Sequence, residues 1–238
     1  MNILLIHGQS HKGTTYHMGR LLAGKLAAAG SEEITEFFLP DDLYCFCKGC
    51  YSCIEDETAC PFWEQKEPFI NAMERADVFI LTTPTYCLAP SGPMKSFLDL
   101  CCDLCMIHRP KPWMFRKRAV ILSSSAGSSC RKTLRTVKDS LELWGVPWIR
   151  KYGIAVRATS WETVPPDKKA KIESAISGIS SGILRDMRSG RPPRAGLRPR
   201  LMFGFIRPLH SAGWDASPKE KAYWEEHGWL GSARPWKG

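Results

Sequence analysis

Four cysteines have the spacing of thiols that bind a metal centre. Two residues separate each of the first three and the fourth is followed by proline, which gives the set Cys47, Cys50, Cys53 and Cys60. Gaps of two residues let consecutive thiolates surround one centre, and a distant Cys-Pro completes a ferredoxin-like run. The spacing predicts capacity for a [4Fe-4S] cluster, with a zinc ion or free redox-active thiols as alternatives.

Other cysteines are not assigned to that centre. Cys45 is an extra thiol without an assigned role. Cys101, Cys102 and Cys105 lie on one predicted helix, where a buried cysteine commonly acts as a small apolar side chain. We expect these three to fill space in the core.

Residues 8–15 have the composition of a phosphate-binding loop. They read Gly-Gln-Ser-His-Lys-Gly-Thr-Thr. Small residues let backbone N–H groups converge, hydroxyls add donors, and the N-terminus of a following helix attracts an anion. Lys12 precedes Gly13 instead of following it, which disfavours a triphosphate site, and a G-x-G-x-x-G fingerprint is absent. The alternative is a plain strand-to-helix turn closed by a threonine cap.

The elements around these residues alternate between strand-like and helix-like segments. The predicted strands are 2–7, 33–39, 78–81, 119–122 and 148–156, and the predicted helices are 14–29, 68–76, 92–106, 131–144 and 167–187. Strands that alternate with helices predict an α/β fold with a doubly wound, five-stranded parallel sheet. Ligands of such sheets bind at the carboxyl ends of the strands, so the loops after the first, third and fourth strands are the candidate site.

Two of those loops complement residues 8–15. The loop 82–95 contains three prolines and one aromatic residue, Tyr86, and can hold backbone donors against the edge of a ring. The loop 123–129 is small and rich in hydroxyl donors. Three such loops at one edge predict a site for a phosphate attached to a heteroaromatic ring.

Charge distribution and the lengths of the apolar runs indicate how the chain is organised and where the protein is located. The 238 residues carry a net charge of +9, and residues 188–238 hold ten Lys and Arg against four Asp and Glu. We therefore expect a domain at 1–187, with its cysteine-rich loop at 45–60, and an irregular, basic, Trp-rich extension at 188–238 that packs on the body or on a neighbouring subunit. Contact of this extension with a membrane surface or a nucleic acid is the alternative. No apolar run approaches the roughly 20 residues that span a bilayer, and no signal peptide is evident, so we expect a cytoplasmic protein.

In combination, these motifs resemble the flavodoxin-like NAD(P)H-dependent FMN reductases and quinone reductases, including their iron-sulfur flavoprotein branch. The resemblance rests on residues 8–15, on Pro84-Thr85-Tyr86 with 92–99, and on 47–53 with Cys60. It implies an FMN site in which residues 9–15 hold the phosphate, 84–87 line the ring and 124–127 close its other edge. The implied residues are Gln9, Ser10, His11, Lys12, Gly13, Thr14, Thr15, Pro84, Thr85, Tyr86, Cys87, Ser124, Ser125, Ala126 and Gly127.

The resemblance implies hydride transfer from NAD(P)H through FMN to a small acceptor such as a quinone or a flavin, with no catalytic side chain required. A second hypothesis is an electron carrier that uses FMN and a [4Fe-4S] cluster with a redox protein partner. A metal-dependent nucleic-acid module rests only on charge and cysteines, and the loop 8–15 argues against it. The family also implies a homodimer or homotetramer.

Overall fold

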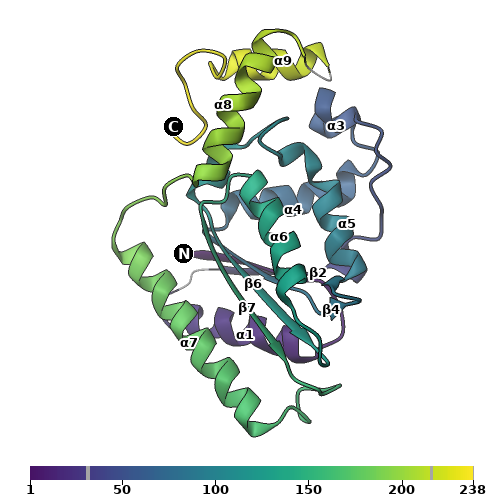
Figure 1. Cartoon of the computed structure of the whole chain (residues 1–238), viewed down its shortest axis with the longest axis vertical. Coiled ribbons are helices and arrows are strands. Elements are labelled where there is room, and N and C mark those ends of the chain that lie inside the picture. The colour runs from purple at the N-terminus through teal and green to yellow at the C-terminus, as the bar shows by residue number, and fades with distance from the viewer. Residues whose placement is uncertain (31–32, 215–216, 238) are drawn as a thin grey trace.

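Five parallel strands form the central sheet, in the order β2-β1-β3-β6-β7 (Figure 1). The structure is a computed structural model that describes residues 1–30, 33–214 and 217–237. The strands are β1 (Asn2–His7), β2 (Glu33–Phe38), β3 (Val78–Thr82), β6 (Arg118–Ser125) and β7 (Trp148–Ala155). This order changes direction at β1 and β3, as in flavodoxin-like sheets, so the predicted fold class is confirmed.

Helices cover both faces of the sheet. One face carries α1 (Thr14–Ala27) and α7 (Pro166–Arg188), and the other carries α4 (Trp63–Arg75), α5 (Gly92–Leu100) and α6 (Arg131–Leu143). Short elements connect them: α2 (Leu39–Asp42), α3 (Ser52–Glu55), a hairpin of β4 (Thr85–Tyr86) and β5 (Ala89–Pro90), and the 3-10 turns η1 (Glu57–Ala59), η2 (Cys102–Leu104) and η3 (Pro112–Arg116). The chain ends in α8 (Leu197–Ser211) and α9 (Pro218–Glu226).

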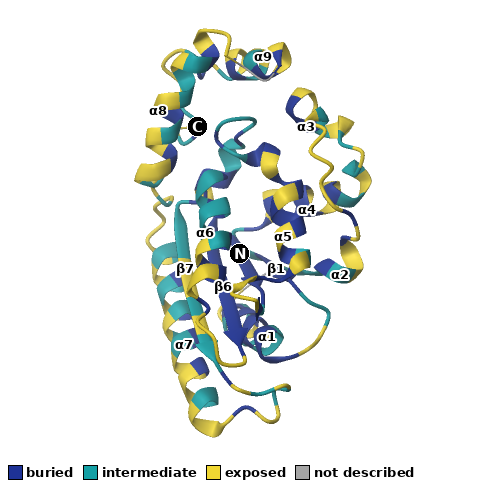
Figure 2. Cartoon of the chain, turned by 45° about the vertical axis from the view of Figure 1, so that its right-hand side comes forward, coloured by how far each residue is buried: buried dark blue, intermediate teal, exposed yellow. Residues whose placement is uncertain are grey.

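The strand side chains alternate between two apolar cores. Leu4, Phe79 and Ile121 pack on the side of α4, α5 and α6. Their neighbours Ile3 and Ile80 pack on the side of α1 and α7. Helices therefore shield both faces of the sheet from solvent, and Figure 2 shows the central strands as buried. Double coverage explains why the central strands are apolar over most of their length.

Two predicted helices differ from the structure by more than two residues at one end. The helix expected at 68–76 begins at Trp63, and Pro68 lies inside it on the solvent side, where the carbonyl group that loses its partner can meet water. The helix expected at 92–106 ends at Leu100, because the chain turns there to bring Asp103 against Lys66. Both side chains of that ion pair are 1% exposed.

The expectation of an irregular extension was wrong, since α8 and α9 are regular helices. Ser217 caps α9 by accepting a hydrogen bond from the backbone N–H of Lys219, and Pro218 occupies the first turn. Phe203, Trp224 and Trp229 form a third apolar core with Met106 and Phe115 of the body. Tertiary contacts between aromatic rings thus stabilise helices in a sequence rich in proline and glycine.

None of the helices in the described part of the chain has the length and apolar character that crossing a bilayer requires.

A buried histidine lies at the end of β1, directly before the loop 8–15. The Nδ1 atom of His7 lies 2.9 Å from Thr82 Oγ1, and its Nε2 atom lies 2.8 Å from a carboxylate oxygen of Glu36. Because a carboxylate only accepts, a neutral His7 donates from Nε2 to Glu36 and accepts the Thr82 hydroxyl at Nδ1. Desolvation by burial lowers the pKa of His7 from its ordinary 6.5, and Glu36 offsets only part of this effect.

This histidine predicts a dependence of stability on pH. The unfolded chain binds the proton near pH 6.5 and the folded chain binds it only at lower pH, so the free energy of unfolding falls as the pH drops below about 6.5. The variant His7→Gln cannot titrate and loses this component. Urea unfolding over a series of pH values measures the slope for both proteins. Identical slopes below pH 6.5 would contradict the assignment.

Candidate functional site

The carboxyl ends of four strands surround one cleft of about 310 Å³. Its walls come from the segments after β1, β3 and β7 and from the end of β6, at the edge of the sheet where β4 is labelled in Figure 1. Eleven of the fifteen residues predicted from sequence line it: Gln9, His11, Gly13, Thr14, Thr15, Pro84, Thr85, Tyr86, Ser124, Ser125 and Ala126. The three predicted loops therefore meet at one place.

The floor of the cleft is the first turn of α1. Gly13 is the N-cap residue and provides no side-chain hydrogen bond to the turn. The backbone N–H groups at the start of a helix have no partner within it, and together with the helix dipole they attract an anion. The side chains of Thr14 and Thr15 lie at the same turn and are each 7% exposed. This geometry suits a phosphate group.

A short hairpin forms one wall. The Thr85 hydroxyl lies 2.9 Å from Ser123 Oγ and donates to Thr133 Oγ1 at 2.8 Å, which fixes β4 to β6 and α6. The turn of the hairpin places Cys87 at φ 49° and Leu88 at φ 63°, a left-handed conformation that side chains rarely adopt. Tyr86 is 52% exposed at the rim, so its ring is available to a planar ligand.

The remaining four predicted residues do not line the cleft. The Ser10 hydroxyl donates to Asp41 Oδ2 at 2.6 Å, and Lys12 Nζ lies 5.7 Å from the centre of the Tyr16 ring. Cys87 is exposed at the hairpin turn, and Gly127 is exposed beyond the end of β6. The structure therefore separates these side chains from the group that surrounds the cleft.

Sequence reasoning missed three residues of the cleft, Val156, Ala158 and Thr159. They follow β7, and the Thr159 carbonyl lies 3.4 Å from His11 Nε2, which joins this segment to the loop after β1. The rule that ligands meet the carboxyl ends of parallel strands would have found them if it had been applied to the fifth strand.

A second hollow, of about 430 Å³, is lined by five of the cysteines. Its lining includes the four predicted ligands Cys47, Cys50, Cys53 and Cys60 and also Cys102. Cys102 was expected to fill the core and is instead exposed, because α5 ends before it. Cys101, by contrast, is fully buried, and burial raises its pKa to about 12. The hollow and the cleft share no lining residue.

The thiols of the hollow are not arranged around a common point. Cys47 and Cys50 are exposed, Cys60 is half-buried and Cys53 is buried. Cys53 is hydrogen-bonded to Cys102, which together with burial raises the pKa of Cys53, and the same hydrogen bond lowers the pKa of Cys102. Among the described residues, no three His, Cys, Asp or Glu side chains already converge as a metal site would require.

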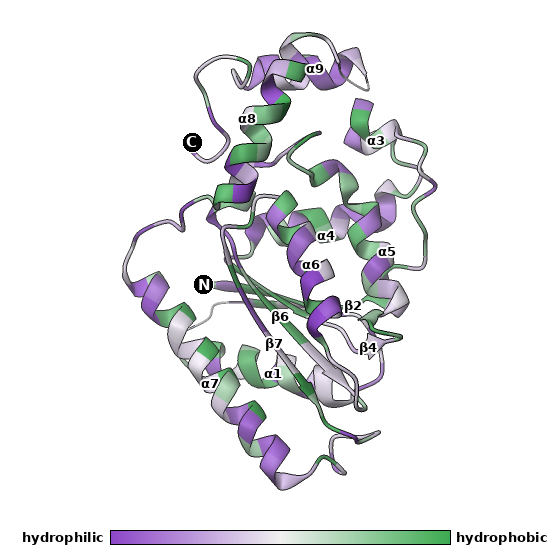
Figure 3. Ribbon diagram, in the orientation of Figure 1, coloured by the Kyte–Doolittle hydropathy of each residue, from purple (hydrophilic) through white to green (hydrophobic). Residues whose placement is uncertain are grey.

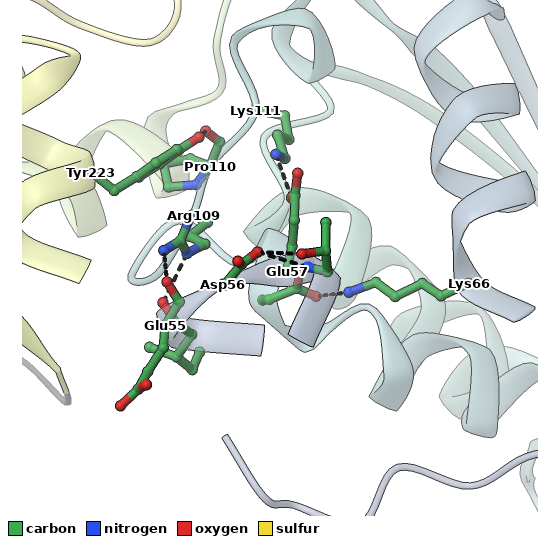
Figure 4. Close-up of polar contacts among 11 residues, drawn as sticks. Glu55, Asp56, Glu57, Lys66, Arg109, Pro110, Lys111 and Tyr223 are labelled. Carbon is green, nitrogen blue, oxygen red and sulfur yellow. Dashed lines mark hydrogen bonds and ion pairs between the residues drawn. The ribbon is translucent and has the colours of Figure 1, made fainter. Parts of the chain in front are cut away.

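Polar contacts hold the segment that carries these cysteines to the body (Figure 4). The Arg109 guanidinium donates to the carbonyl groups of Ile54 and Glu55, and Lys111 pairs with Glu57 at 2.6 Å. The ring of Tyr223, from α9, lies 4.9 Å from the Arg109 guanidinium. The segment 105–116, which contains no β-strand, therefore contacts both the cysteine-rich segment and the C-terminal helices.

Solved structures share the fold of this chain. An azoreductase from Bacillus anthracis strain Sterne is 11% identical with a TM-score of 0.58, and the match covers 77% of this chain and 98% of that one. An FMN-dependent NADH-azoreductase from strain Ames Ancestor, in complex with FMN, is 10% identical with a TM-score of 0.58, covering 76% and 100%. An NAD(P)H:quinone oxidoreductase from Methanothermobacter marburgensis is 12% identical with a TM-score of 0.55, covering 79% and 97%.

A comparison with curated proteins finds no match. The sequence profile of the family described as NADPH-dependent FMN reductase matches residues 1–159, which include β1 to β7 and every residue that lines the cleft. The chain therefore belongs to the NADPH-dependent FMN reductase family and is an NAD(P)H-dependent flavin oxidoreductase.

Proposed function

We propose that the cleft at the carboxyl edge of the sheet holds FMN, and that the enzyme passes electrons from NAD(P)H to a small planar acceptor such as a quinone or a flavin. The observation that carries the proposal is the meeting of a helix N-terminus and three donor-rich loops around one cleft. When bound, FMN supplies the hydride chemistry. The chain itself binds and orients the ligand.

The residues of the cleft fit FMN in type and position. The free N–H groups at the start of α1 and the hydroxyls of Thr14 and Thr15 suit the phosphate. The segment Pro84–Tyr86 and the end of β6 offer backbone donors and one aromatic ring to the edge and face of the isoalloxazine. The buried hydrogen bonds of Thr85 to Ser123 and Thr133 hold that wall in place without a ligand. Binding therefore loses less conformational entropy than it would with a mobile loop.

Exposure of Tyr86 at the rim supports a small, planar acceptor. An aromatic side chain at the mouth of the cleft can stack on a conjugated ring without hydrogen-bonding to a particular substituent, so it favours a class of acceptors and not a single compound. Assembly into a homodimer or homotetramer stays a prediction from the family resemblance, and light scattering measures it directly.

We expect the full chain to take up FMN, and NADH or NADPH to bleach the flavin absorbance rapidly under anaerobic conditions. A quinone added next should be reduced by the flavin, and the flavin absorbance should return as the flavin is reoxidised. Stopped-flow spectrophotometry follows both steps. A protein that cannot be reconstituted with FMN would refute the proposal.

A pair of hydroxyl variants tests the phosphate assignment. Thr15→Val keeps the shape of the side chain and removes the donor, so the dissociation constant for FMN should rise roughly tenfold or more, as for other hydrogen bonds to a charged group. Ser10→Ala is the matched control, because that hydroxyl is bonded to Asp41 outside the lining of the cleft. Quenching of FMN fluorescence gives both constants. Equal affinities in the two variants would contradict the assignment.

The cysteine hollow supports a second candidate function, an iron-sulfur flavoprotein that transfers electrons to a protein partner. The observation in its favour is that Cys47, Cys50, Cys53 and Cys60 line one hollow although they span fourteen positions of the chain. Thiolates are the ligands of iron-sulfur clusters. The exposed thiols of Cys47 and Cys50 would have to turn toward Cys53 and Cys60 to share one cluster.

Anaerobic reconstitution of the full chain with iron and sulfide tests this candidate. If it holds, the protein gains a broad visible absorbance and acid-labile sulfide, and Cys50→Ser loses most of both. Cys105→Ser is the matched control, because Cys105 does not line the hollow. Retention of iron by Cys50→Ser, or loss of iron by Cys105→Ser, would contradict the ligand set.

A further inference from the structure

Helix α8 has apolar side chains on two opposite sides, and the body covers one of them. The inward side contributes Pro199 and Phe203, which are buried together with the polar ring of His210. The Phe203 ring stacks on Trp224 with 4.9 Å between ring centres and an interplanar angle of 18°. These inward contacts attach the helix and leave the apolar residues on its opposite side exposed.

The outward side carries three large apolar residues four positions apart, Leu197, Leu201 and Phe205. They are 72%, 64% and 70% exposed, and Trp214, just beyond the end of the helix, is 78% exposed. A spacing of four places side chains along one side of a helix. Figure 3 shows the hydrophobic residues along α8, and Figure 2 shows exposed residues on the same helix. This outward stripe is unlike the scattered apolar residues of an ordinary surface.

The stripe lies within a strongly positive part of the chain. Residues 188–214 contain six arginines and no aspartate or glutamate. Arg198 pairs with Asp139 and Glu142 at 2.8 and 3.4 Å. No ion pair is recorded for Arg191 or Arg194 within the described residues, and both are exposed. Exposed positive charge therefore directly precedes the stripe in the sequence.

We propose that α8 and the arginines before it dock the protein on an anionic lipid bilayer. Leucine, phenylalanine and tryptophan beside a run of arginines is the composition of helices that lie in the membrane interface. The stripe would enter the boundary between headgroups and acyl chains, and Arg191 and Arg194 would meet the lipid phosphates. No membrane-spanning helix is needed.

Charge favours this occupant over the alternatives. A second copy on the same face would bring two arginine-rich segments together, and like charges across an interface oppose association. A nucleic acid would neutralise the arginines but would leave the apolar stripe in water, because its outer surface is a phosphate backbone. An anionic bilayer accommodates both the charge and the apolar side chains.

Sedimentation with lipid vesicles tests the proposal on the full chain. The protein should bind vesicles of phosphatidylglycerol mixed with phosphatidylcholine and should bind vesicles of pure phosphatidylcholine weakly. The double variant Leu201→Asp with Phe205→Asp should lower the partition coefficient roughly tenfold or more, because it removes two side chains from the apolar phase. Arg191→Gln with Arg194→Gln should also weaken binding, and added salt should abolish the difference from wild type.

Tyr44→Asp is the matched control, since Tyr44 is 75% exposed and lies far from α8 in the sequence. It should bind vesicles as the wild type does. The melting temperatures of all variants should stay close to that of the wild type, because every altered side chain is exposed.

Three results would overturn the proposal. One is equal binding to the two kinds of vesicle. Another is unchanged binding by the Leu201 and Phe205 double variant. The third is a wild-type oligomer, seen by light scattering, that this double variant converts to monomers, because a second copy would then cover the stripe.

Discussion

The close approach of two strand ends at Gly8 constrains the site more than any other contact. The Gly8 N–H donates to the Thr82 carbonyl at 2.7 Å, and the Ser91 hydroxyl donates to the Gly8 carbonyl at 2.7 Å. A Cβ atom at Gly8 would lie 2.7 Å from Ser91 Oγ, which no real side chain could tolerate without a shift. This contact sets where the loop after β1 leaves the sheet, and it joins that loop to the segment that precedes α5. The first turn of α1 and the β4–β5 hairpin consequently face each other across the cleft.

Two chemically different regions lie at opposite ends of α5. The helix starts after the hairpin that lines the cleft and ends beside the cysteine hollow, and its nine residues extend about 13 Å. The buried pair of Lys66 and Asp103 links α4 to the segment after the far end, where α5 stops and Cys102 turns outward. The same segment then continues to the contacts that hold α8 and α9. The cleft proposed for FMN, the cysteine hollow and the α8 stripe proposed for membrane docking therefore share no residue.

Periodicity and the alternation of elements predicted the sheet, its parallel strands and the three loops that meet at the cleft. These features depend on local patterns, namely apolar strands covered on both faces and small residues at strand ends. The end of α5 was not predictable in this way, because it depends on Asp103 reaching Lys66 from 37 residues away. For the same reason Cys102 was misassigned. The two C-terminal helices were missed because aromatic contacts with Met106 and Phe115 outweigh their local sequence preferences. Thr159 was missed because it follows the fifth strand, whereas the predicted site comprised the loops after the first, third and fourth strands.

The most direct test of FMN binding at the cleft is a crystal structure of the full chain with FMN. We predict that the FMN phosphate lies at the first turn of α1, within hydrogen-bonding distance of the Thr14 and Thr15 N–H groups, with the ring beside Pro84–Tyr86. FMN bound at the cysteine hollow, or a phosphate outside the loop 9–15, would contradict it.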